Sequence, residues 1–202
     1  RCYGVQSGRS RPTLVGTGWA AGVMLQPGAG RLLLGQDVST VTDRHVELSD
    51  VLGSQVVTDV RAAMTDPQDP GCRREAADSL EAVIRAHLPL DDEGRLVNDL
   101  VDHIEHDPSV RQVSQVCDRF GLSERALQRL TRRRLGLTPK WLIQRRRLHE
   151  ASERLRAGPG DLAAIAHDLG YADQAHFTRD FRRVTGITPG GFARRFAAGA
   201  DA

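Results

Sequence analysis

The C-terminal half of this 202-residue chain contains an internal duplication, and no other feature of the sequence restricts its fold as strongly. The segment Gly136–Pro139, Gly-Leu-Thr-Pro, recurs fifty positions later as Gly186–Pro189, Gly-Ile-Thr-Pro. Upstream, Leu127, Arg129, Arg132 and Arg133 correspond at the same offset to Phe177, Arg179, Arg182 and Arg183. Further upstream the offset falls to forty-nine, with Cys117 onto Ala166 and Gly121 onto Gly170, so the second turn has one extra residue. The chain therefore contains two related units, which we call the first and second repeat.

Each repeat has the sequence features of a helix-turn-helix. In the first repeat Gly121 suits a tight turn because it lacks a Cβ, and Ser123 can cap a helix running to about Leu135. In the second repeat Asp173 can cap the helix that carries Phe177 and Phe181. The apolar residues of the two preceding helices are Val110, Val113, Val116 and Cys117 in the first repeat and Leu162, Ile165, Ala166 and Leu169 in the second. This pattern predicts that the second helix of each repeat enters a DNA major groove.

The segment between the repeats predicts one long helix, from Pro139 through Ala157, ended by Gly158–Gly160. Its apolar face consists of Trp141, Leu142, Leu148, Ala151 and Leu155. A stiff spacer of this kind would hold the two recognition helices about one turn of B-DNA, ~34 Å, apart. Its arginines Arg145–Arg147 are expected to be a mixture of solvated side chains and side chains with buried stems, and we do not assign them to DNA.

The charge is distributed unevenly along the chain. Residues 1–94 hold 9 Arg and 13 acidic residues, a net −4, whereas residues 95–202 hold 19 basic and 13 acidic residues, a net +6, which together give the +2 of the whole chain. A basic half joined to an acidic half favours a polyanion as the partner of the basic half alone. Of the basic residues only Lys140 is a lysine, which suits bidentate contacts to guanine and phosphate but is equally explained by genome composition.

From about Leu96 to Phe196 the chain resembles the DNA-binding domain of the AraC/XylS family of bacterial transcription regulators. In the first repeat and the spacer the matching residues are Ser123, Arg125, Leu127, Arg129, Thr138, Pro139, Arg147, Leu148, Ala151 and Leu155. In the second repeat they are Ile165, Ala166, Leu169, Gly170, Tyr171, His176, Phe177, Arg179, Phe181, Gly186, Thr188, Pro189 and Phe192. The resemblance implies a seven-helix domain that binds one face of DNA through two adjacent major grooves.

The resemblance also implies which side chains meet DNA. The expected base-contacting residues are Arg125, Gln128 and Arg129 in the first repeat and Gln174, His176, Thr178 and Arg179 in the second. The alternative is that these polar residues are only the solvated face of an amphipathic helix. Arg132, Arg133, Arg182 and Arg183 are expected to touch phosphates or solvent rather than bases. Thr131 departs from the family pattern, which usually has an aromatic residue there as at Phe181, and this predicts poorer core burial in the first repeat.

The N-terminal half predicts a partial companion domain over residues 1–91, followed by the double helix-turn-helix domain over residues 92–202. Residues 1–48, with the apolar stretches Thr17–Leu25 and Leu32–Leu34 between Gly and Pro turns, predict short strands. Helices are expected from Ser49 or Asp50 to about Met64 and from Arg73 to Leu88, the latter burying Ala76, Leu80, Val83, Ile84 and Leu88. Residues 89–94 predict a polar break before a helix that opens with Leu96 and stops near Asp107. The expected fold class is mainly α, with a small β-rich N-terminal remnant; Val23–Gly53 resembles the end of a ligand-sensing or dimerisation domain of the same family.

Residue types needed for other chemistry are absent or scattered. Cys2, Cys72 and Cys117 have no paired spacing, so neither a disulfide framework nor a zinc site is expected; Cys72 is either a sensing thiol or an inert cysteine. His103 and His106 have ligand-compatible spacing but no third ligand nearby. Trp19 and Trp141 are interpreted as core residues. No cofactor, no metal and no enzymatic activity are expected. The alternatives are an N-terminal ligand-sensing or enzymatic module, including a DNA-repair methyltransferase that would need four zinc-binding cysteines, and a regulator that acts through partner contacts alone.

The expected partners are double-stranded DNA and RNA polymerase, together with a small-molecule effector or a second copy of the chain at the N-terminal half. No apolar run reaches the ~18–20 residues of a membrane span, and a cytoplasmic location is expected. Since the first residue is Arg1 rather than Met, the sequence is expected to be part of a longer chain.

Overall fold

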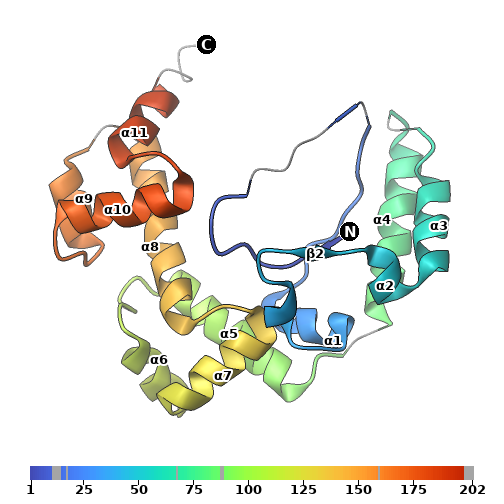
Figure 1. Cartoon of the computed structure of the whole chain (residues 1–202), viewed down its shortest axis with the longest axis horizontal. Helices are drawn as coiled ribbons and strands as arrows, with labels where there is room; N and C mark the ends of the chain where they lie inside the picture. The colour runs from blue at the N-terminus through green and yellow to red at the C-terminus, as the bar shows by residue number, and fades with distance from the viewer. Residues whose placement is uncertain (11–14, 17, 67, 87–88, 159, 198–202) are drawn as a thin grey trace. The chain divides into compact units, whose positions relative to one another are not determined.

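The computed structural model describes residues 1–10, 15–16, 18–66, 68–86, 89–158 and 160–197. Thr17, Leu88 and Pro159, which the sequence placed in a strand, a helix and a helix-ending turn, lie outside these residues. The chain forms two compact bodies (Figure 1). The N-terminal body comprises Arg1–Val5, Arg11–Val101 and Gln128–Leu137. The C-terminal body comprises Gln6–Ser10, Asp102–Leu127 and Thr138–Ala202.

The N-terminal body begins with a small antiparallel sheet in which β1 (Cys2–Tyr3) pairs with β2 (His45–Val46). Between these strands lie the 3-10 helix η1 (Pro27–Ala29), the one-turn helix α1 (Gly30–Leu34) and the 3-10 helix η2 (Val38–Val41). The predicted strands at Thr17–Leu25 and Leu32–Leu34 are therefore wrong: described residues 18–25 contain no strand, and Leu32–Leu34 belong to α1. Gly35 ends α1 in the left-handed conformation, with φ 66°. A short apolar run beside glycine fits either a strand or a helix turn, and local pattern does not separate them.

Three further helices complete the N-terminal segment. The predicted single helix from Ser49 or Asp50 to Met64 is wrong, since Gly53, with φ 88°, divides it into α2 (Leu48–Leu52) and α3 (Ser54–Ala63). Helix α4 (Pro70–Arg85) begins where Asp69 accepts a hydrogen bond from the Gly71 amide at 2.9 Å. Figure 1 shows α3 and α4 as neighbouring helices. Val60 of α3 and Ala76 and Leu80 of α4 are buried.

Helix α5 (Asp92–His106) starts earlier than the predicted polar break allowed. The Asp91 carboxylate accepts a hydrogen bond from the Gly94 amide at 2.8 Å, so the acidic residues form the first turn of the helix instead of a loop. The residues Val97, Leu100, Val101 and Ile104 form its buried face. The chain continues through α6 (Val113–Phe120) and α7 (Glu124–Leu135).

The C-terminal body is organised around α8 (Pro139–Arg156), the spacer helix that the sequence predicted. Helices α9 (Leu162–Asp168), α10 (Gln174–Thr185) and α11 (Pro189–Ala197) gather about its C-terminal end (Figure 1). Their shared core contains Leu148, Ala151, Leu155, Ile165, Ala166, Leu169, Tyr171, Phe177, Phe181, Phe192 and Ala193. Helices α5–α11 make up the predicted set of seven, and the prediction of a mainly α fold is confirmed. No helix in the described ranges is long and apolar enough to span a membrane.

The two tryptophans are less buried than expected. Both Trp19 and Trp141 are partly exposed, so neither is a fully buried core residue. The Trp141 indole Nε1 donates a hydrogen bond to the Ser7 carbonyl oxygen at 3.0 Å. An indole ring has an apolar body and one donor, so it fits a half-buried position where that donor finds an acceptor.

The packing of Phe181 gives a test of the C-terminal core. Its ring is fully buried and lies edge-on to Phe177 and Phe192, with centroids 5.7 and 5.4 Å away. We expect Phe181→Ala to lower the free energy of unfolding by about 3–5 kcal/mol through lost burial and a cavity. We expect Phe196→Ala, at a position 41% exposed, to cost about 1 kcal/mol or less. Urea denaturation followed by circular dichroism measures both, and equal losses would contradict this account of the core.

Candidate nucleic-acid interface

The turn of the first repeat has the geometry that its sequence predicted. Gly121 follows α6 with φ 63°, and the Leu122 amide bonds the Cys117 carbonyl oxygen at 3.0 Å. The Ser123 hydroxyl then accepts a hydrogen bond from the Ala126 amide at 3.2 Å, which caps α7. These contacts reverse the chain between α6 and α7 and satisfy backbone groups that helix ends otherwise leave unpaired.

The second repeat forms its turn in the same way. Gly170 has φ 74°, and the Tyr171 amide bonds the Ala166 carbonyl oxygen at 2.9 Å. The Asp173 carboxylate accepts a hydrogen bond from the His176 amide at 2.6 Å, as the sequence predicted for the cap of α10. A second cap, which the sequence analysis missed, is Asp161, whose carboxylate accepts from the Ala163 amide at 2.8 Å and begins α9.

Helix α7 separates its polar and buried residues by helical periodicity. Its buried side consists of Leu127, Leu130, Thr131, Arg134 and Leu135. The side chains expected at DNA bases, Arg125, Gln128 and Arg129, are exposed, and so is Arg132. Thr131 is 0% exposed, and its hydroxyl donates to the Gln128 carbonyl oxygen at 3.3 Å. The threonine therefore occupies a core position with its polar group satisfied inside the helix.

Helix α10 shows the same separation. Its residues Gln174, His176, Arg179 and Arg182 are exposed, and Thr178 is half-buried. On the other side Phe177 and Phe181 are fully buried. The His176 imidazole stands edge-on to Tyr171, with ring centroids 5.2 Å apart, and its Nε2 lies 3.8 Å from an Asp180 oxygen.

Four arginines, Arg132, Arg133, Arg182 and Arg183, were expected to touch phosphates or solvent. Within the described ranges, two of them form ion pairs and two do not. Arg133 forms an ion pair with Glu93, and Arg183 forms one with Asp180 at 3.3 Å. Arg132 and Arg182 are exposed, and neither has an acidic partner among the residues that the structure describes. Arg132 and Arg182 thus keep a free charge for a polyanion, whereas the charge of each neighbour is shared with a carboxylate.

The arginines of α8 serve the protein itself. Arg145 pairs with Glu105 at 3.2 Å. Arg146 donates to the Val110 carbonyl oxygen at 3.0 Å and pairs with Glu150 at 3.3 Å, and burial lowers its pKa. The Arg147 guanidinium lies 3.9 Å above the Tyr171 ring centroid, a cation–π contact. These contacts match the expected mixture of solvated and buried-stem arginines.

Comparison with known proteins shows which proteins the C-terminal part of the chain resembles. A helix-turn-helix domain model matches residues 116–195. The transcriptional activator RhaS of Escherichia fergusonii is 39% identical over 87 residues, which are 43% of this chain and 30% of the relative. RhaS of Pectobacterium carotovorum is 36% identical over 74 residues, which are 37% of this chain and 26% of the relative. Residues 116–195 are therefore similar to AraC-type helix-turn-helix domains.

The matched stretch thus spans less than a third of the length of these relatives. A crystal structure of ToxT from Vibrio cholerae aligns with a TM-score of 0.42 at 16% identity, covering 73% of this chain and 55% of that one. At this TM-score the likeness is not evidence of a common fold. The AraC-type domain is therefore assigned from the family model and the RhaS relatives.

Three polar residues that sequence analysis did not single out form contacts between separate helices or segments. Asp180 accepts a hydrogen bond from Gln144 of α8 and pairs with Arg183, so it links α10 to the spacer helix. Arg111 donates to the Asp168 carbonyl oxygen at 2.9 Å and so ties the segment before α6 to the end of α9. Arg134 is buried and forms ion pairs with Asp91 and Glu93 at the start of α5. Only Arg134 left a signal in the sequence, a charge in the apolar register of its helix.

The described residues hold no group of three or more side chains that could bind a metal. The three cysteines are free thiols, and burial raises the pKa of Cys2 and of Cys117. The Cys72 thiol lies 3.2 Å from an Asp69 oxygen.

Tyr171 gives a pH-dependent test of the packing under α10. Burial raises the pKa of its phenol to about 12, and the hydroxyl has no hydrogen-bond partner in the described part of the chain. A folded-state pKa above the unfolded value of 10 means that this contribution to stability is complete below pH 10 and is lost as pH rises toward 12. We expect Tyr171→Phe to change stability at pH 7 by about 1 kcal/mol or less and to weaken the loss between pH 10 and 12. Denaturation curves across this pH range would contradict the account if both proteins lost stability in parallel.

Proposed function

We propose that this chain is a transcription regulator that binds a specific DNA sequence with α7 and α10 in two adjacent major grooves. The observation that supports this most strongly is the matched pair of helices, each preceded by a glycine turn and a capping side chain and each with an exposed polar row. A helix that follows such a turn is the element that enters the groove in helix-turn-helix proteins. The RhaS relatives are named as transcriptional activators, which favours DNA-binding transcription regulation for this chain.

The exposed side chains suit base recognition. Arginine can donate two hydrogen bonds to the O6 and N7 atoms of guanine, and glutamine can pair with the N6 and N7 atoms of adenine. Arg129 and Arg179 occupy equivalent positions fifty residues apart, and we assign them to bases together with Arg125, Gln128, Gln174 and His176. Thr178 is half-buried and would meet a base or sugar at the edge of the contact. Arg132 and Arg182 would meet phosphates.

The remaining partners follow from this function. An activator has to contact RNA polymerase, and we propose RNA polymerase as the second macromolecular partner, in the cytoplasm. The N-terminal half would then receive an effector or a second copy of the chain. We propose a regulator and not an enzyme, and the naming of the RhaS relatives as transcriptional activators favours this.

The equivalent arginines provide the test of base recognition. A binding site is first selected from a random DNA pool. We expect Arg129→Ala and Arg179→Ala each to weaken binding to that site about 5- to 100-fold, the loss of one bidentate base contact, with little change in stability because both side chains are exposed. Arg61→Ala, at an exposed position of α3, is the matched control. If each variant lost affinity equally for selected and random DNA, the two arginines would contact only the backbone.

The dependence of affinity on salt tests the phosphate contacts separately. Neutralising a phosphate releases condensed counterions, so the logarithm of the binding constant falls by about 0.9 per contact for each tenfold rise in salt. We expect Arg132→Ala and Arg182→Ala each to reduce this slope by about 1 and to weaken binding similarly on all sequences. A slope that does not change in either variant would remove these arginines from the interface.

A further inference from the structure

Two positions that are apolar in α10 are polar and buried in α7. At the offset of fifty, Thr131 of α7 corresponds to Phe181 of α10, and Arg134 corresponds to Val184. Phe181 lies in the apolar core of the C-terminal body, and Val184 packs against that core. In α7 the corresponding residues are a hydroxyl and a guanidinium, with Thr131 0% and Arg134 1% exposed. A buried charge is stable only when it is paired and hydrogen-bonded.

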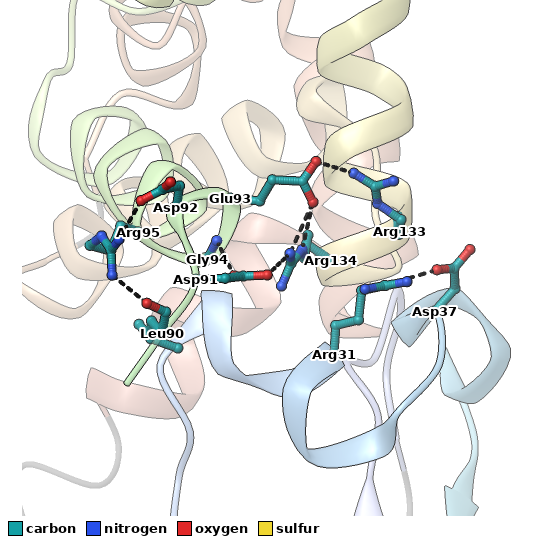
Figure 2. A network of polar contacts seen from close by, with 10 residues as sticks. All are labelled: Arg31, Asp37, Leu90, Asp91, Asp92, Glu93, Gly94, Arg95, Arg133 and Arg134. Atoms are coloured by element: carbon teal, nitrogen blue, oxygen red, sulfur yellow. Dashed lines mark hydrogen bonds and ion pairs between the residues drawn. The ribbon is translucent and has the colours of Figure 1, made fainter. Parts of the chain in front are cut away.

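The partners of Arg134 lie at the start of α5, with Asp91 immediately before the helix and Glu93 in its first turn. Its guanidinium donates to both Asp91 and Glu93, with the Nη2 and Nε atoms 2.9 and 3.2 Å from one Glu93 oxygen (Figure 2). The other Glu93 oxygen accepts from Arg133. The hydrogen bond from Arg134 holds the pKa of both carboxyl groups below its ordinary value, against the opposing effect of burial. The charge inside α7 is therefore matched by acids from outside the helix.

A second segment holds the end of α7 directly. The Thr42 hydroxyl donates to the Gly136 carbonyl oxygen at 3.0 Å, where the helix has just ended. Gly136 has φ 74°, and a Cβ built there would lie 2.1 Å from the Thr42 side-chain oxygen. The two segments of the chain therefore approach too closely for a side chain at this position. Arg31 lies in the same segment and forms an ion pair with Asp37 at 3.3 Å (Figure 2).

The same segment also binds the start of α5. The Gly28 amide donates to the Asn98 side-chain oxygen at 2.8 Å, and the Asn98 amide group donates to the Gln26 side chain at 2.8 Å. A Cβ on Gly28 would lie 2.1 Å from the Gly94 carbonyl oxygen. Residues 26–42 thus contact both α5 and the end of α7, all within the N-terminal body.

We propose that residues 26–42 and 91–98 form a clasp that positions the recognition helix of the first repeat. Arg134 is the positioning residue that the clasp holds. Helix α10 needs no such clasp, because Phe181 and Val184 anchor it in an apolar core. The first recognition helix therefore depends on residues 26–42 and 91–98, and the second does not contact them within its own body. The consequence for DNA rests on the proposed function, but the clasp itself does not.

Hydrogen exchange in the full chain tests the clasp without DNA. In Thr42→Val one hydrogen bond is lost at nearly constant volume and the half-buried Gly136 carbonyl loses its donor. We expect amides of α7 to exchange about tenfold faster, with those of α10 unchanged. Arg134→Met should have a larger effect with the same selectivity. Thr42→Ser keeps the hydroxyl and should restore protection. Thr58→Val, at an exposed position of α3, is the matched control.

Selective loss of protection in α7, rescued by Thr42→Ser, supports the clasp. Unchanged exchange in α7, or an equal loss of protection in α7 and α10, would overturn it. These measurements keep their meaning if the chain binds no DNA.

Binding to the selected DNA site tests the functional consequence. Scrambling either half of the site gives two further probes, one for each recognition helix. We expect Thr42→Val to weaken binding about tenfold when the half bound by α7 is intact and to have little effect when that half is scrambled. An equal loss on both probes would show that the clasp does not act through the first recognition helix. If the unmodified chain showed no preference for any sequence, the proposed function would fail while the exchange result for the clasp still held.

Discussion

A recognition helix can present polar side chains to DNA only if its opposite side is held firmly, because a short helix is not stable alone in water. Both α7 and α10 are twelve residues long, and their exposed rows carry arginines that also repel one another. The stabilising contacts therefore have to come from the buried side of each helix. The caps and glycine turns of the repeats, and the spacer helix between the repeats, place that buried side against a support.

The two helices obtain this support by different means. Helix α10 uses aromatic packing, in which Phe177, Phe181 and Phe192 contact one another edge to face. Apolar packing is nondirectional, and the core around α10 is built from α8, α9, α10, α11 and the turn between α9 and α10. Helix α7 replaces part of that packing with a guanidinium, two carboxylates and a threonine hydroxyl, which act only at short range and in the correct geometry. A helix supported in this way is more sensitive to small displacements of its partners.

This difference gives the acidic residues at the start of α5 two roles. Asp91 caps the helix through the Gly94 amide, and it also pairs with Arg134. Glu93 binds Arg133 and Arg134 together, so it neutralises one arginine that the sequence assigned to phosphate or solvent. The charge available to DNA on α7 is therefore smaller than its arginine count suggests, and Arg132 becomes the principal phosphate candidate of the first repeat.

The sequence by itself determined the local geometry of this protein. Gly121, Ser123, Gly170 and Asp173 act through contacts within a few residues, so their types and spacing predicted both turns and both caps. The repeat also marked the two helices that we propose as recognition helices. Tertiary structure decided what short-range patterns do not contain, namely the burial of Arg134 and its ion pairs with Asp91 and Glu93. The physical reason is sequence separation, since Arg134 is stabilised by residues more than forty positions away and Gly136 by one ninety-four positions away. Such partners become neighbours only when the chain has folded.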